Sequence, residues 1–326
     1  MSDMESNERN QAAHWERGVL EKIALEGIAE QRRARRWGIF FKLLGLAYLG
    51  VFLLAISDWN NSVDQLGEGQ AHTALVQIHG VIQAKGSASA ENVMTALQSA
   101  FKSKGTRGII LSINSPGGSP VQAGMINDEI ARLRAKYPQV PLYVVVEDYC
   151  ASGGYYVAVA ADKIFVDKAS VVGSVGVLMD GFGFTGTLDK LGVERRLMTS
   201  GDNKGFLDPF SPQNPAHLAH AQKLLDEVHQ QFIDAVRKRR GQRLKETPEI
   251  FSGLMWSGAR SVEMGLADDF GTVESVARDV IKAEHIRDYT VEETFAERFS
   301  KRLGASMADS ALGALSSLGQ VGGGMR

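Results

Sequence analysis

The hydrophobic pattern divides the chain into an apolar N-terminal run and a longer region of alternating strands and helices. Residues 37–57 read WGIFFKLLGLAYLGVFLLAIS and are apolar except for Lys42. A helix of this length spans about 31 Å at about 1.5 Å per residue, which matches the hydrocarbon core of a bilayer. Lys42 lies near one end, where its stem can carry the ammonium group to the headgroups. The pattern predicts a single N-terminal transmembrane helix over residues 37–57.

The flanking charges predict which way this helix is oriented. Four arginines precede the run and acidic residues follow it: Arg32, Arg33, Arg35 and Arg36, then Asp58, Asp64 and Glu68. The positive-inside rule keeps residues 1–36 in the cytoplasm and predicts that everything after Asp58 is exported. A cleaved signal peptide and a buried soluble helix are the alternatives. The long N-terminal segment argues against the first and the uninterrupted apolar run against the second.

Beyond a linker at residues 58–72, strand-like and helix-like segments alternate, which predicts an α/β domain with a largely parallel sheet at residues 73–285. The expected strands are residues 73–82, 107–113, 141–147, 163–167 and 170–179, and the expected helices are residues 90–103, 120–137, 152–162 and 215–240. Gly265 is expected to end a later helix. Residues 286–326 form a C-terminal extension that turns to Ala, Gly and Ser and is expected to be partly disordered.

Composition narrows the classes of function. The formal net charge of -2 provides no basic field, which argues against nucleic acid as a partner. The single cysteine, Cys150, excludes an intramolecular disulfide and a cysteine-based zinc cluster. His217 and His220 are spaced closely enough to bind a metal, but no third ligand is evident, so a solvated helix face is the simpler interpretation. Neither a metal nor a cofactor is predicted.

Two loops of small residues each follow a predicted strand and precede a predicted helix. The first contains Pro116-Gly117-Gly118, a turn whose bare backbone N–H groups can hold an oxyanion. The second exposes Ser152 before two glycines, at a helix start where N–H groups favour developing negative charge. Each loop also has a plainer interpretation, as an ordinary turn between strand and helix and as a helix-capping serine.

Taken together, the motifs INSPGG, ASGGYY and VGSVGV resemble signal peptide peptidase A over roughly residues 73–283. This family is related to the proteolytic subunit of Clp protease and to crotonases. The resemblance implies a βα superhelix of that type and a serine endopeptidase that hydrolyses remnant signal peptides and other hydrophobic peptides. It places this activity at the outer, periplasmic face of the bacterial cytoplasmic membrane. It also implies a homo-oligomeric ring, in which serine and lysine meet across a domain boundary.

The resemblance assigns the site residues. Ser152 is the implied nucleophile, Lys204 in SGDNKGFLDPF the general base, and Ser174 the residue that orients the lysine. The implied oxyanion donors are the N–H groups of Gly118 and Gly153, with Gly117 as a substitute for Gly118 if the turn differs. A lysine acts as a base only when it is neutral, so burial is expected to bring the pKa of such a lysine down toward neutral pH.

The sequence also allows several alternative functions and alternative site residues. A peptidase that trims one membrane-protein partner would use the same residues, whereas a crotonase-type acyl-CoA enzyme would not need Lys204, and a catalytically idle scaffold would need neither residue. The spacing of Ser99 and Lys102 fits S-x-x-K but lacks the companion motifs of penicillin-binding proteins. Cys150 stands where a hydrolase elbow, G-x-S-x-G, has its first glycine.

Overall fold

The computed structural model describes residues 32–33, 35–52 and 69–291. The chain divides into two compact units, residues 1–68 and 69–326, and each is described by itself. In the first unit, residues 35–52 are helical with exposed side chains. No helix among the described residues combines the length and apolarity needed to cross a membrane. Residues 53–57 of the predicted span lie outside the described part of the chain.

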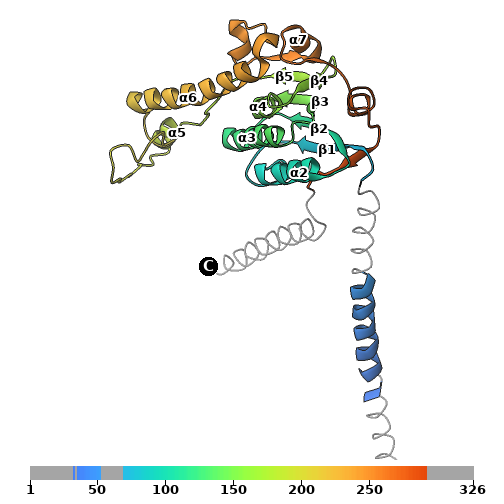
Figure 1. The fold of residues 1–326 in the computed structure, drawn as a ribbon. Coiled ribbons are helices and arrows are strands. Elements are labelled where there is room, and N and C mark those ends of the chain that lie inside the picture. The colour runs from blue at the N-terminus through green and yellow to red at the C-terminus, as the bar shows by residue number, and fades with distance from the viewer. Residues whose placement is uncertain (1–31, 34, 53–68, 292–326) are drawn as a thin grey trace, which may run out of the picture. The chain divides into compact units, whose positions relative to one another are not determined.

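An eight-stranded sheet forms the centre of the second unit (Figure 1). Its main path runs β6 (Met255–Ser257), β5 (Val171–Gly173), β3 (Leu142–Ala151), β2 (Thr106–Ser115), β1 (His72–His79) and β8 (Ile286–Asp288). Off this path, β4 (Lys163–Val166) pairs with β3 and with β7 (Asp269–Phe270). Every pairing is parallel except that of β5 with β6. The predicted α/β fold with a largely parallel sheet is confirmed.

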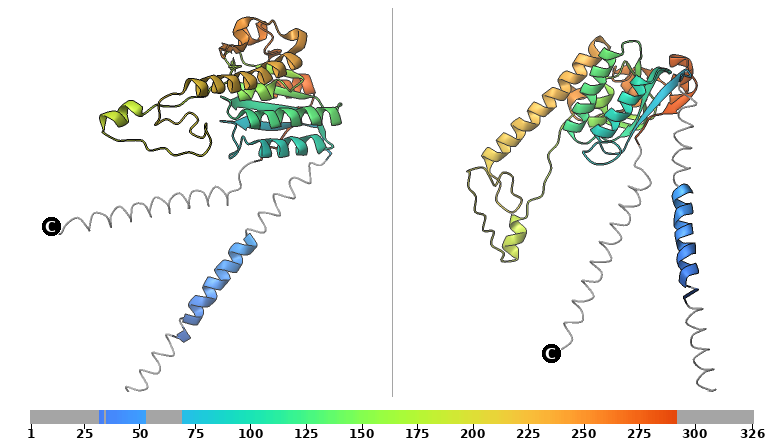
Figure 2. Two further views of the ribbon diagram at one scale, coloured as in Figure 1. Left: turned by 90° about the vertical axis from the view of Figure 1, so that its left-hand side faces the viewer. Right: turned by 60° about the horizontal axis from the view of Figure 1, so that its bottom comes forward.

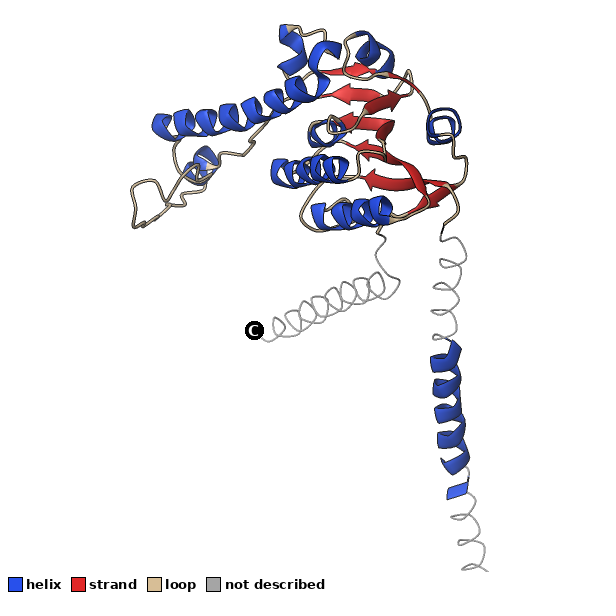
Figure 3. Cartoon of the chain, in the orientation of Figure 1, coloured by secondary structure: helices blue, strands red, loops and turns tan. Residues whose placement is uncertain are grey.

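Helices cover both faces of this sheet (Figure 3). On one face, α2 (Ala90–Lys102), α3 (Pro120–Lys136) and α4 (Gly153–Ala158) share the larger apolar core with the strands. Ser89 and Ser119 cap α2 and α3, each accepting a hydrogen bond from a backbone N–H of the first turn. On the other face, α8 (Val273–Ser275) leads into a π-helix (Val276–Ile281) that covers a smaller core with Ile110, Val145 and Phe165.

Between β5 and α6 (Pro215–Arg240) the chain leaves the body of the domain as an arm, residues 177–214, which carries the short helix α5 (Thr185–Lys190). Figure 2 shows this arm and the first half of α6 projecting away from the sheet. The strand predicted over residues 170–179 is therefore wrong beyond Gly173. It ends there because Ser174 adopts a φ of 54°, a left-handed conformation that interrupts an extended strand.

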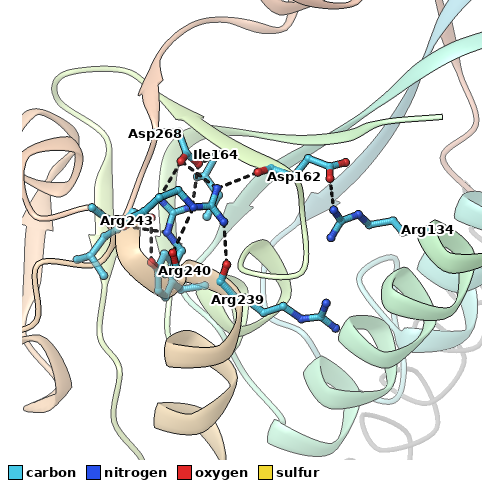
Figure 4. Close-up of polar contacts among 10 residues, drawn as sticks. Arg134, Asp162, Ile164, Arg239, Arg240, Arg243 and Asp268 are labelled. Atoms are coloured by element: carbon cyan, nitrogen blue, oxygen red, sulfur yellow. Dashed lines mark hydrogen bonds and ion pairs between the residues drawn. The ribbon is translucent and has the colours of Figure 1, made fainter. Parts of the chain in front are cut away.

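A buried ion-pair network fastens the carboxyl end of α6 to the sheet (Figure 4). Arg240, whose side chain is 1% exposed, donates two hydrogen bonds to Asp268 at 2.8 and 3.1 Å and a third to the Gly265 carbonyl. Arg243 reaches the same carboxylate at 3.1 Å, and the Ile164 N–H donates to it at 2.7 Å. The network thus fixes the carboxyl end of α6 to the sheet. Gly265, at a φ of 76°, follows α7 (Gly258–Glu263), which confirms the predicted helix end.

Candidate active site

Three adjacent parallel strands, β2, β3 and β5, end at one place and bring the sequence motifs together. Ser115 of β2 is in register with Cys150 of β3, and Ala151 is in register with Gly173 of β5. The residues that follow these strand ends therefore lie side by side: the turn 116–118, Ser152 and Ser174. Ligand sites of parallel sheets commonly form at the carboxyl ends of the strands.

Ser152 stands on a sharp turn between β3 and α4. Its φ of 51° and ψ of -121° are rare for a residue other than glycine, and its N–H donates to the Gly173 carbonyl at 2.9 Å. The side chain makes no capping hydrogen bond to α4, so the plainer role of a helix-capping serine is not observed. Strained non-glycine residues gather at functional sites, because the surrounding structure must hold them in place.

The turn after β2 lies directly against this serine and offers one free N–H group. The Gly117 N–H is buried and donates to Ser115 Oγ at 3.1 Å, so it is not available to a ligand. Within residues 69–291, neither the Gly118 N–H nor the Gly153 N–H donates a hydrogen bond. A Cβ placed on Gly153 would lie 3.3 Å from the Gly118 nitrogen, so the two loops are in contact. The geometry favours Gly118 over its substitute Gly117 as an oxyanion donor.

Ser174 shares a cavity of about 520 Å³ with Ser152, Gly118 and Gly153. Its N–H donates to the Leu254 carbonyl at 2.7 Å, and its hydroxyl has no hydrogen-bond partner among residues 69–291. The cavity walls include the apolar side chains of Val177 in the arm and of Val228 and Phe232 in α6, together with Tyr156 of α4. The site therefore combines a small polar centre with apolar walls, as peptide and other organic ligand sites commonly do.

The structure does not bring Lys204 to this cavity. Lys204 lies exposed on the arm, its N–H donates to the Gly201 carbonyl at 3.1 Å, and it is not among the residues that line the site. The four other predicted residues, Ser152, Ser174, Gly118 and Gly153, do converge. Within one copy of the chain, the proposed base is separated from the proposed nucleophile.

Two features of the site were not predicted. The first is Ser115, which is fully buried and accepts a hydrogen bond from the Gly117 N–H. Its position in the INSPGG motif was the only sequence signal for this role. The wall formed by α6 was also missed, although Val228, Phe232 and Val236 recur at helical spacing along one face of that helix.

The rival residues are otherwise engaged. Cys150 is fully buried and burial raises the pKa of its thiol, so it is an inert core residue. Ser99 donates to the Thr95 carbonyl within α2 at 3.0 Å. His217 Nε2 lies 3.1 Å from Asn203 Oδ1, and the described residues contain no group of three or more possible metal ligands.

Several known proteins are similar in sequence to part of this chain. A protein of Brucella melitensis named Na(+)/H(+) antiporter NhaA is 42% identical over 209 residues, which are 63% of this chain and 28% of that protein. A protein of Enterococcus faecium that carries the name of signal peptide peptidase SppA is 29% identical over 240 residues, 71% of this chain and 69% of that one. The chain thus spans less than a third of the Brucella relative.

More distant relatives carry protease names. Serine protease SPPA of Arabidopsis thaliana chloroplasts is 27% identical over 210 residues, 64% of this chain and 31% of that protein. A solved chain described as a mutant of the 1510-N membrane-bound stomatin-specific protease overlaps 69% of this chain and 99% of its own length at 11% identity, with a TM-score of 0.40.

Residues 134–287 match the family described as Peptidase family S49. This span contains Ser152, Ser174 and Lys204, and it begins after the Gly117-Gly118 turn. The match agrees with the resemblance to signal peptide peptidase A that the motifs suggested. Over residues 134–287 the chain is similar to peptidase family S49.

Proposed function

We propose that this protein is a serine endopeptidase in which Ser152 attacks the scissile carbonyl. The observation that carries the proposal is the strained Ser152 turn beside two unbonded N–H groups, those of Gly118 and Gly153, in one cavity. Attack by Ser152 Oγ on a peptide carbonyl would place the oxyanion within reach of these donors. The leaving amine takes a proton, an acyl-enzyme forms on Ser152, and water then hydrolyses it.

A serine hydroxyl needs a base, and we assign that role to Lys204. The base is not beside Ser152 in one copy of the chain. His217, which contacts the Lys204 loop, and Phe232, which lines the cavity, are 15 residues apart on α6. At about 1.5 Å per residue, that separation is about 22 Å along the helix, several times the length of a lysine side chain. Lys204 would therefore serve the Ser152 of a neighbouring copy.

The surface of the arm supports such an assembly. Large apolar side chains on it are exposed to solvent: Leu178 at 80%, Phe182 at 77%, Leu191 at 70% and Met198 at 94%. Exposed apolar surface of this kind commonly marks a binding surface. We propose that a second copy covers the arm and that repetition of this contact closes a homo-oligomeric ring.

The proposed location is supported by the sequence, and the proposed substrate class is supported by the cavity. We propose that residues 37–57 anchor the chain in the bacterial cytoplasmic membrane, with the domain on the outer face. The cavity surfaces formed by Tyr156, Val177 and Phe232 suit hydrophobic peptides. Remnant signal peptides are hydrophobic peptides released at this membrane, and we propose them as the substrates. We also propose that the α/β domain is a βα superhelix of the type found in Clp protease and crotonases.

The proposal is tested by incubating the full chain with synthetic signal peptides and with an acyl-CoA. A fluorophosphonate, which labels activated serines, reports on Ser152 independently of the substrate. Peptide cleavage and labelling that both disappear in Ser152→Ala support the peptidase. Turnover of the acyl-CoA, with no peptide cleavage and no labelling, would instead establish the crotonase alternative.

A further inference from the structure

Two histidines near the start of α6 have no part in the site described so far. His217 is half-buried, and its Nε2 lies 3.1 Å from the Asn203 side-chain oxygen. The Phe206 ring contacts both imidazoles, with its centroid 5.3 Å from that of His217 and 5.7 Å from that of His220. Both contacts reach into the loop that carries Lys204.

Lys204 stands between these two attachment points. Asn203 precedes it and Phe206 follows it by two residues, so the backbone of Lys204 is held to α6 on both sides. Within the loop, the Lys204 N–H donates to Gly201 at 3.1 Å and the Phe206 N–H donates to Asn203 at 3.1 Å. The Lys204 side chain is exposed and has no partner among residues 69–291. The backbone is fixed, whereas the amine is free to reach outward.

The other end of α6 is fixed as well. Arg240 and Asp268 fasten it to the sheet, and Phe232 borders the Ser152 cavity. One helix therefore connects a cavity at its carboxyl half with a lysine-bearing loop at its first turn. The position of that loop on α6 determines where the lysine amine can be presented.

We infer that His217 is a positioning residue for Lys204, holding the loop through its hydrogen bond to Asn203 and its contact with Phe206. With the proton on Nε2, His217 donates to Asn203 Oδ1. This inference rests on the proposed function and adds to it the device that orients the base. Its effect falls on the geometry of proton transfer and not on peptide binding, because His217 does not line the cavity.

The test compares single and double variants of the full chain. His217→Ala is expected to lower kcat about 10-fold with KM unchanged, because a misplaced base slows chemistry without weakening binding. Asn203→Ala should give the same loss of kcat. The double variant should show no further loss, since each substitution removes the same hydrogen bond. His217→Gln, whose amide can donate to Asn203, should restore part of kcat. Gln222→Ala is the control on α6, because among residues 69–291 the Gln222 side chain hydrogen-bonds only to Asp226.

The outcomes separate this inference from the function on which it rests. Additive losses in the double variant, or wild-type kcat in both single variants while Lys204→Ala is inactive, would overturn the role of His217 alone. Full activity in Lys204→Ala would instead overturn the assigned base. Thermal unfolding and oligomer size are measured for every variant. If His217→Ala does not fold, Asn203→Ala tests the same bond from the exposed side, and wild-type kcat in that variant counts against the inference.

Discussion

At the scale of single residues, the site depends on backbone conformations that side chains rarely adopt. Ser152 and Ser174 both have positive φ, at 51° and 54°. Each such residue costs on the order of 1–3 kcal/mol, which neighbouring contacts must offset. For Ser152 they include the hydrogen bond to Gly173 and the packing of Gly117, where an added Cβ would meet Ser152 Cβ at 2.7 Å. Serine and turn therefore hold each other in place.

Gly118→Ala is expected to abolish most of the activity. Gly118 has a φ of 146°, and an added Cβ would lie 2.1 Å from the Ile82 carbonyl oxygen, so the turn must shift and carry its N–H away from the oxyanion. Loss of one oxyanion donor costs about 100- to 1,000-fold in kcat. Gly124→Ala in α3 is the matched control, because its added Cβ would make only an ordinary contact with Tyr156 at 4.0 Å. Wild-type kcat in Gly118→Ala would show that the Gly118 N–H is not an oxyanion donor.

Among the site residues, sequence motifs located those that lie at strand ends. Gly118, Gly153 and Ser174 converge with Ser152 because adjacent parallel strands end together. Ser115 could not be assigned, since the bond it makes depends on how the turn folds back onto its own side chain. The relation of Lys204 to the site could not be read from spacing either, because the arm carries it away from the body of the domain.

At the scale of elements, helices with clear boundary residues were predicted closely. The helix expected at residues 215–240 is observed as α6, between Pro215 and a Gly241 with a φ of 52°. The strand expected through residue 179 ends at Gly173, because the positive φ of Ser174 is a tertiary feature without a local signal. The π-helix likewise has no signature in the apolar pattern.

Arg240→Ala is expected to destabilise the domain strongly. The substitution leaves the Asp268 carboxylate, 11% exposed, without its main partner, and breaking such a buried pair costs about 3–5 kcal/mol. Arg260→Ala is the control, because its pair with Glu263 is exposed and contributes little. Urea unfolding measures both free energies. Equal stabilities for the two variants would show that the network does not anchor α6.

The same network predicts how stability depends on pH. Burial alone would raise the pKa of Asp268, but hydrogen bonds and charge from Arg240 outweigh it and hold that pKa below its ordinary value. The stabilisation is therefore present above the pKa of an unfolded aspartate and is lost as pH falls through the lower folded value. The free energy of unfolding should fall at acid pH in the wild type. A fall just as steep in Asp268→Asn would contradict this assignment.

At the scale of the whole molecule, the account requires two copies to complete one site. Co-expressed Ser152→Ala and Lys204→Ala chains should form mixed oligomers, in which one copy supplies the serine and its neighbour the lysine. With equal amounts and random assembly, about one quarter of the sites would be intact. Activity in the co-purified mixture, and none in either variant alone, is expected. An inactive mixture with verified mixed oligomers would place the dyad within one copy.

The arm should be the contact that assembles these copies. Met198→Asp places a charge on a side chain that is 94% exposed in the single chain, so it should leave folding intact while disrupting an apolar interface. Size measurement by light scattering is expected to show smaller particles with lost peptidase activity. Unchanged size and activity would remove this surface from the interface.

The serine–lysine assignment is tested most directly by the kcat for signal-peptide cleavage in Lys204→Ala, measured on the full chain beside wild type and Ser152→Ala. The account predicts that both variants lose more than about 1,000-fold in kcat while oligomer size and thermal unfolding stay as in the wild type. Wild-type cleavage by Lys204→Ala, with Ser152→Ala inactive, would contradict it and require another base for Ser152.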